Sequence, residues 1–114
     1  MKYMIMHYSN DDNEADVPPT PELIEQMGKY MGEVAQSGVL LAAEGVRASS
    51  YGARLTIDGD KVTVKDGPFA EAKELIAGFG ILDVKSKEEA IEHAKRFAKV
   101  SGATKIDVRL VAEF

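Results

Sequence analysis

The chain has 114 residues, enough for one hydrophobic core but too few for two nucleotide-binding halves or a closed α/β barrel. Apolar residues make up 45% of it and charged residues 29%, as in an ordinary globular domain. The absence of cysteine excludes thiolate nucleophiles, disulfides and cysteine-bound metal sites. We therefore expect one domain over residues 1–114.

Acidic residues dominate the charge. Nineteen Asp and Glu against fourteen Lys and Arg give a net charge of −5, and the stretch from Tyr3 to Gly28 carries six acids and no basic residue. Such a surface repels a phosphate backbone, so nucleic acid is not an expected partner. No basic segment followed by a long apolar run opens the chain, and no run is long enough for a membrane span. We expect a cytoplasmic protein without membrane contact.

The first elements are read from apolar runs and turn residues. Residues 2–8 form a short apolar run typical of a buried strand, and residues 10–19 form a polar, acidic loop. Thr20 is suited to cap a helix that ends at Gly38. This helix carries one apolar stripe, in which the two methionines are interpreted as core rather than ligand surface (Leu23, Met27, Met31, Val34). Residues 39–42 then predict a second buried strand.

A β-hairpin follows, and its register can be argued from the alternation of side chains. A two-residue loop at Gly59-Asp60 is a favoured hairpin turn. With this loop, Ile57 pairs with Val62 and Leu55 with Val64, so that all four apolar residues share one face. A slip of one residue would scatter them over both faces.

The last elements complete an α+β pattern. Residues 75–84 predict a strand whose two glycines indicate a bulge or a close approach, and residues 105–111 predict the final strand. Between them, Ser86 and Glu89 form a capping box that begins a helix ending at Gly102. The apolar stripe of this helix leaves His93 as a solvated surface residue.

The resulting order is β-α-β-β-β-β-α-β. It predicts a ferredoxin-like α+β sandwich with an inserted hairpin, in which one antiparallel sheet carries two helices on one face. The other face of the sheet would expose apolar side chains. We therefore expect a homodimer that forms through the sheet.

The string Asp66-Gly67-Pro68-Phe69, followed by Lys73-Glu74, resembles the DGPF group of the YCII-related superfamily. The similarity covers nearly the whole chain, with further matching strings in order along it (Met1–Met4, Gly38–Leu41 before Glu44, Gly78-Phe79, Ile81–Val84, Asp107–Arg109). It implies a dimeric fold related to the dimeric α+β barrels. Some relatives in the wider superfamily are enzymes with a His–Asp pair that uses a histidine on the first helix. Residues 20–37 contain no histidine, so this pair does not transfer.

Three titratable residues are candidates for acid/base work: Asp66, Glu44 and His7. Asp66 and Glu44 follow separate strands, and two neighbouring carboxylates would shift each other's pKa. His7 lies near the end of the first strand and carries an imidazole that titrates near neutral pH. The alternative interpretation is structural, with Asp66 and Gly67 forming a turn and His7 a partly buried residue.

Candidate ligand-binding residues flank the same motif: Phe69, Lys73 and Glu74. Phe69 could equally fill the core, and the two charged residues could be a solvated pair. No ligand spacing suggests a metal, and no motif suggests a cofactor.

Two functions remain open from the sequence. The first is binding of a small organic molecule in a cleft, with acid/base catalysis as a further possibility. The second is a non-catalytic accessory or regulatory role through protein contacts, for example with an extracytoplasmic-function sigma factor, because some DGPF proteins are encoded beside such factors. A filled cleft would favour the second function, and a cavity would favour the first.

Overall fold

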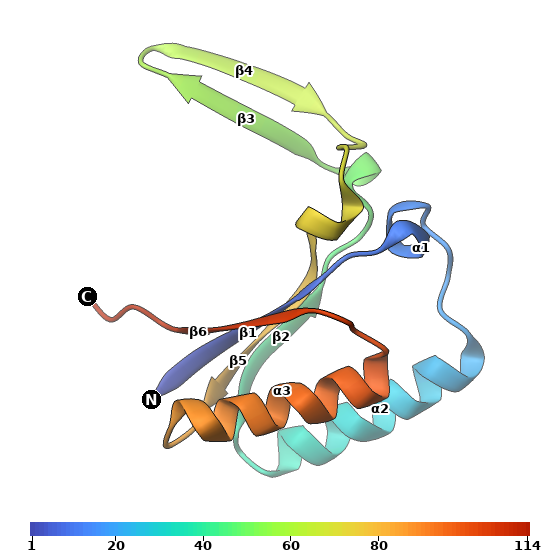
Figure 1. Cartoon of the computed structure of the whole chain (residues 1–114), viewed down its shortest axis with the longest axis vertical. Helices are drawn as coiled ribbons and strands as arrows, with labels where there is room; N and C mark the ends of the chain where they lie inside the picture. The colour runs from blue at the N-terminus through green and yellow to red at the C-terminus, as the bar shows by residue number, and fades with distance from the viewer.

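A four-stranded antiparallel sheet with two long helices on one face forms the body of the molecule (Figure 1). The computed structural model describes residues 1–114. The sheet has the order β2-β5-β1-β6. Its strands are β1 (Lys2–Tyr8), β2 (Leu40–Gly45), β5 (Ile76–Asp83) and β6 (Ile106–Leu110), and the two helices are α2 (Pro21–Gln36) and α3 (Lys87–Ser101).

The inserted hairpin is a separate two-stranded sheet that projects from the body (Figure 1). It consists of β3 (Ala53–Asp58) and β4 (Lys61–Asp66), and it lies between β2 and β5 in the chain. Without it the order is β-α-β-β-α-β, which confirms the predicted ferredoxin-like α+β fold.

The hairpin register is the one predicted. Ile57 pairs with Val62, and Thr56 pairs with Thr63 on the other face. Gly59 adopts a φ of +60°, the left-handed conformation that this tight turn requires. Alternation of apolar and polar residues was therefore sufficient to fix the pairing.

Both helices begin at the predicted caps. The Thr20 hydroxyl accepts a hydrogen bond from the Leu23 amide at 3.2 Å, and the Ser86 hydroxyl accepts one from the Glu89 amide at 3.1 Å. The Glu89 carboxylate accepts from the Lys85 amide at 2.9 Å, one residue before the position that a capping box uses. Neither helix combines the length and the apolar character needed to cross a membrane.

One turn of helix, α1 (Asp11–Glu14), lies within residues 10–19, where the sequence predicted only a loop. The Asn10 side chain caps it by accepting a hydrogen bond from the Asn13 amide at 2.8 Å. The acidic residues in its first turn interact favourably with the positive, N-terminal end of the helix dipole. Two 3₁₀ turns, η1 (Ser49–Tyr51) and η2 (Ala72–Glu74), flank the hairpin.

The core is small for a chain of this length. Its buried cluster joins the sheet to α3 (Tyr3, Leu82, Val84, Ala90). Only 11 of 114 residues are buried, and no large side chain is fully buried. The radius of gyration is 15.8 Å, against about 13 Å expected for a compact chain of this length. Much apolar surface, on the hairpin above all, is therefore left without an intramolecular partner.

Candidate functional site

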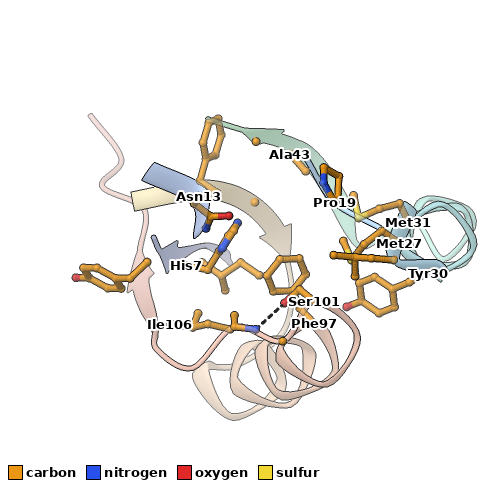
Figure 2. Close-up of a pocket in the computed structure, with 18 of the residues that line it drawn as sticks. His7, Asn13, Pro19, Met27, Tyr30, Met31, Ala43, Phe97, Ser101 and Ile106 are labelled. Atoms are coloured by element: carbon orange, nitrogen blue, oxygen red, sulfur yellow. Dashed lines mark hydrogen bonds between the residues drawn. The ribbon is translucent and has the colours of Figure 1, made fainter. Parts of the chain in front are cut away.

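A cavity of about 740 Å³ lies between the sheet and the helices. Side chains from β1, from the loop around α1, from α2 and from α3 line it, and half of the 30 lining residues are hydrophobic. Figure 2 shows His7, Phe97 and Tyr30 around it, with Met27 and Met31 beside Tyr30. A largely apolar, concave space with few polar groups is typical of a small-molecule site.

His7 lies on the face of the sheet that the helices cover. Its ring centroid is 5.0 Å from that of Phe97 on α3, and the register of β1 on β5 places it opposite Gly78. A Cβ atom at position 78 would lie only 2.5 Å from Nε2 of His7. Gly78 is one of the two strand glycines predicted to mark a bulge or a close approach. Its missing side chain leaves the space that the imidazole of His7 occupies.

The imidazole of His7 is not engaged by other groups of the protein. Neither ring nitrogen has a hydrogen-bond partner in the protein, and neither is sealed from solvent. Burial lowers the pKa of His7 below its ordinary value of 6.5, because the apolar surroundings penalise the charged ring. At neutral pH the residue therefore offers a neutral imidazole, which can accept a proton or a hydrogen bond at one nitrogen and donate at the other.

The two tyrosines that line the cavity use their hydroxyl groups within the protein. Tyr8 donates to the Asp107 carboxylate, and this hydrogen bond raises the pKa of Tyr8. The Tyr30 hydroxyl lies 3.5 Å from the carbonyl oxygen of His93, and burial raises the pKa of Tyr30. Both therefore remain neutral phenols, and His7 is left as the more available polar group.

Two interpretations from the sequence are corrected at this cavity. Met27 and Met31 of α2 do face inward, but they line the cavity and do not fill a closed core. His93 is not a solvated surface residue, since it is half-buried, lines the same cavity and has a buried Nδ1. His93 precedes Phe97 by four residues, and this spacing places both side chains on one face of α3.

The loop around α1 borders the cavity and also contacts the base of the hairpin. Asn13 contributes to the cavity lining (Figure 2). The Glu14 carboxylate accepts a hydrogen bond from the Ser49 amide at 2.8 Å, and Asp16 pairs with Arg47 at 3.0 Å. The loop is thereby fixed to the segment that leads into the hairpin.

Glu44 borders the cavity, but its side chain is not on the His7 face of the sheet. The register pairs Glu44 with Phe79, while His7 pairs with Gly78, and adjacent strand residues point to opposite faces. The Glu44 side chain is accordingly exposed. The side chains of His7 and Glu44 therefore project from opposite faces of the sheet.

Asp66 and Phe69 lie at the base of the hairpin and do not line the cavity. Asp66 is the exposed last residue of β4 and pairs with Ala53. The Phe69 amide donates to the Ser49 hydroxyl at 2.8 Å, and the guanidinium of Arg54 lies 4.2 Å above the Phe69 ring. The motif thus joins the hairpin to η1, and the convergence proposed from the sequence for Asp66, Glu44 and His7 is not seen within one chain.

Lys73 and Glu74 are exposed residues of η2, outside the cavity lining. The Lys73 ammonium lies 3.8 Å from the Glu71 carboxylate, a surface pair of little energetic weight. No group of three or more histidines and carboxylates is arranged to hold a metal ion. The binding roles predicted for these residues and for Phe69 remain predictions.

The model of the YCII-related domain matches residues 1–114. The chain belongs to the YCII-related family. Over 110 residues this YCII-related chain is 26% identical to an uncharacterized protein of Rhizobium meliloti (strain 1021), covering 91% of the chain and 86% of that protein.

Among solved structures, the chain is similar to 5-chloro-2-hydroxyhydroquinone dehydrochlorinase from Burkholderia phenoliruptrix AC1100, which was solved in complex with 2,5-dihydroxybenzoquinone. Sequence identity is 12% and the TM-score is 0.48, with 100% of this chain and 96% of that chain covered.

Proposed function

We propose that this YCII-related protein binds a small, apolar, ring-containing organic molecule in the cavity, with a hydroxyl group of the ligand hydrogen-bonded to His7. One observation carries the proposal: an imidazole without a protein partner lies in an apolar cavity of about 740 Å³. Aromatic rings and methionine thioethers in the lining favour a flat, apolar ligand. A neutral nitrogen of His7 favours a hydrogen-bond donor.

The chemistry available to His7 is proton transfer. A neutral imidazole within hydrogen-bond reach of a ligand hydroxyl can act as a general base. Residues 20–37 carry no histidine, Glu44 follows the register of the opposite face of the sheet, and Asp66 belongs to the separate hairpin sheet. We therefore propose ligand binding as the primary function, with proton abstraction as the reaction type that His7 supports.

The alternative from the sequence, an accessory protein that acts only through protein contacts, predicts a filled cleft. The open cavity supports ligand binding instead. We keep the cytoplasm as the proposed location, on the basis of the cysteine-free sequence.

We also propose that a second copy of the chain covers the apolar surface that the helices leave open. The helix-free face of the sheet carries apolar side chains that are only half-buried (Met4, Met6, Phe79, Ile81). The apolar face of the hairpin is 54–68% exposed (Leu55, Ile57, Val62, Val64). A stable dimer needs about 1,000 Å² of total buried area. The helix-free face of the sheet and the apolar face of the hairpin are the surfaces that would supply it.

The binding proposal can be tested with 4-hydroxybiphenyl, a flat apolar probe that has one hydroxyl donor. We expect saturable binding of one probe per chain in a calorimetric titration at neutral pH. His7→Leu should weaken binding about fivefold, because one hydrogen bond is lost. Absence of saturable binding would contradict the proposal, as would an unchanged affinity of His7→Leu.

Met6→Leu is the matched control. Met6 neighbours His7 on β1, but the register pairs it with Phe79 on the opposite face. This variant should bind the probe as the native chain does. Equal weakening in both variants would show a general disturbance of the strand and not a contact with the imidazole.

A further inference from the structure

Strand β6 forms an edge of the sheet whose outer side has no partner strand. The Tyr8 amide donates to the carbonyl oxygen of Lys105, and the Val111 amide donates to that of Lys2. Because hydrogen-bonding residues alternate along an antiparallel strand, every second residue of β6 turns its N–H and C=O groups away from β1 (Ile106, Val108, Leu110). The opposite edge strand, β2, carries a bulge near its first residue, whereas β6 is regular. A further strand is therefore accepted more readily at β6.

A groove of about 290 Å³ lies beside this edge, between β6 and α3. Most of its lining is apolar and comes from both elements (Ile91, Ala94, Ala98, Ile106, Val108). The register on β1 places Val108 opposite Ile5 and Leu110 opposite Tyr3, so these side chains lie on the helix-covered face of the sheet. The free edge of β6 and the apolar groove are therefore neighbours.

Two cations border the groove, and both already have partners in the chain. Lys95 forms an ion pair with Glu92 at 3.1 Å. The Lys105 ammonium lies 3.9 Å from the centre of the Tyr8 ring, within the range of a cation–π interaction. Neither cation requires an acidic partner, and the apolar lining favours an apolar strand.

The hairpin offers strands of this kind. Its two strands pair only with each other, and an isolated two-stranded hairpin is marginally stable in water. The Gly67 amide donates to the carbonyl oxygen of Gly52, so this pair and every second pair after it form the internal hydrogen bonds. The residues between them turn their backbone groups outward, and their side chains form the exposed apolar face (Leu55, Ile57, Val62, Val64).

The free edges of β6 and of the hairpin are compatible in stereochemistry. Residues directly opposite each other across a β-ladder turn their side chains to the same face of the sheet. When an outward-facing residue of the hairpin lies opposite Val108, backbone hydrogen bonds can form and the apolar face lies on the helix-covered side, against the groove. Thr56 and the polar face of the hairpin then remain on the other side. A slip of one residue would lose both the hydrogen bonds and the apolar contact, so the two requirements select the same registers.

We infer that the hairpin of a second copy of the chain pairs with β6 and extends the sheet, with its apolar face covering the groove beside α3. This inference rests on the proposed second copy and names the two edges that meet. Figure 1 shows the hairpin projecting from the body, which leaves it accessible to another chain. In a two-fold dimer the contact is made twice, because each chain has one hairpin and one free β6 edge.

Amide hydrogen exchange, followed residue by residue by NMR, tests this pairing. The native dimer is compared with Ile57→Lys, in which the apolar face of the hairpin carries a charge, and with Thr56→Lys as the matched control. In the native dimer and in Thr56→Lys, the outward amides of β6 should exchange at least about tenfold more slowly than in Ile57→Lys, because they then donate to the partner's hairpin (Ile106, Val108, Leu110). The outward amides of one hairpin strand should gain the same protection.

Equal exchange rates of the outward β6 amides in the native chain and in Ile57→Lys would overturn the pairing, and a dimer mass of the native chain would then leave the proposed second copy intact. Slow exchange at β6 with both hairpin strands unprotected would show two β6 strands paired with each other, and would also overturn it. A monomeric native chain contradicts both the pairing and the proposed dimer. The amides of Asp107 and Arg109 face β1, so their protection in Ile57→Lys shows that this variant is folded.

Discussion

Gly67 is the residue on which the base of the hairpin depends most directly. A Cβ atom at this position would lie 1.7 Å from the carbonyl oxygen of Ser49. The Gly67 amide also donates to the carbonyl oxygen of Gly52 at 3.0 Å. The glycine of the motif is therefore required by close backbone contact, independently of any chemistry at Asp66.

We predict that Gly67→Ala destabilises the chain by about 1–3 kcal/mol, because the backbone of η1 must move to admit the methyl group. Gly28→Ala is the control of opposite sign. Gly28 lies within α2 and nothing lies within 4 Å of its ideal Cβ, so alanine should stabilise the chain by up to about 1 kcal/mol. Urea denaturation measures both. An unchanged free energy of unfolding in Gly67→Ala would show that the close contact with Ser49 does not require glycine at this position.

The stability of the fold should depend on the protonation of His7. Burial lowers the pKa of His7 in the folded chain below 6.5, so between the folded-state pKa and 6.5 the unfolded chain binds more protons. The free energy of unfolding should therefore fall as the pH falls below about 6.5, and this loss should level off below the folded-state pKa.

His7→Leu should remove that part of the pH dependence. We expect its free energy of unfolding to change less than that of the native chain between about pH 7.5 and 5.5, as measured by denaturation at several pH values. Parallel pH profiles for the two chains would show that His7 titrates alike in the folded and unfolded states.

At the scale of elements, local patterns in the sequence predicted most of the fold. The hairpin register followed from the alternation around Gly59-Asp60, and the caps of both long helices followed from Thr20 and Ser86. The helix α1 was missed because it has a single turn and no apolar periodicity.

The cavity was harder to predict because segments far apart in the sequence form it. His7 was identified as a candidate, since an imidazole at a strand end has evident chemistry. His93 was misread, although its spacing of four residues from Phe97 placed it on the inward face of α3. Asp66 and Glu44 were grouped by their positions at strand ends, but Asp66 ends a strand of the separate hairpin sheet and the strand register turns Glu44 outward.

The hairpin should contribute to association more than to the stability of one chain. Ile57 is 68% exposed, so Ile57→Lys should change the free energy of unfolding of the single chain by no more than about 0.5 kcal/mol. In the proposed dimer it would place a charge in an apolar contact and weaken association at least tenfold. Thr56→Lys, on the other face of β3, is the control.

Sedimentation equilibrium of the two variants tests this role of the hairpin. We expect Ile57→Lys to dissociate at concentrations at which Thr56→Lys remains associated. Equal association of both variants would place the interface elsewhere on the molecule.

For the molecule as a whole, the proposed second copy would cover apolar surface that the small core of one chain leaves open. We predict a homodimer at micromolar concentration, with the helix-free face of the sheet as the main contact. Light scattering that gives the 12.4 kDa mass of one chain would contradict this prediction.

Proton–nitrogen NMR spectra of the backbone amides and of the imidazole rings, recorded during titration with 4-hydroxybiphenyl, test ligand binding in the cavity most directly. We expect saturable shifts of the His7 ring signals and of the Phe97 amide signal, because both residues line the cavity that the probe would occupy. Shifts confined to the exposed apolar hairpin, with the signals of His7 and Phe97 unchanged, would contradict it.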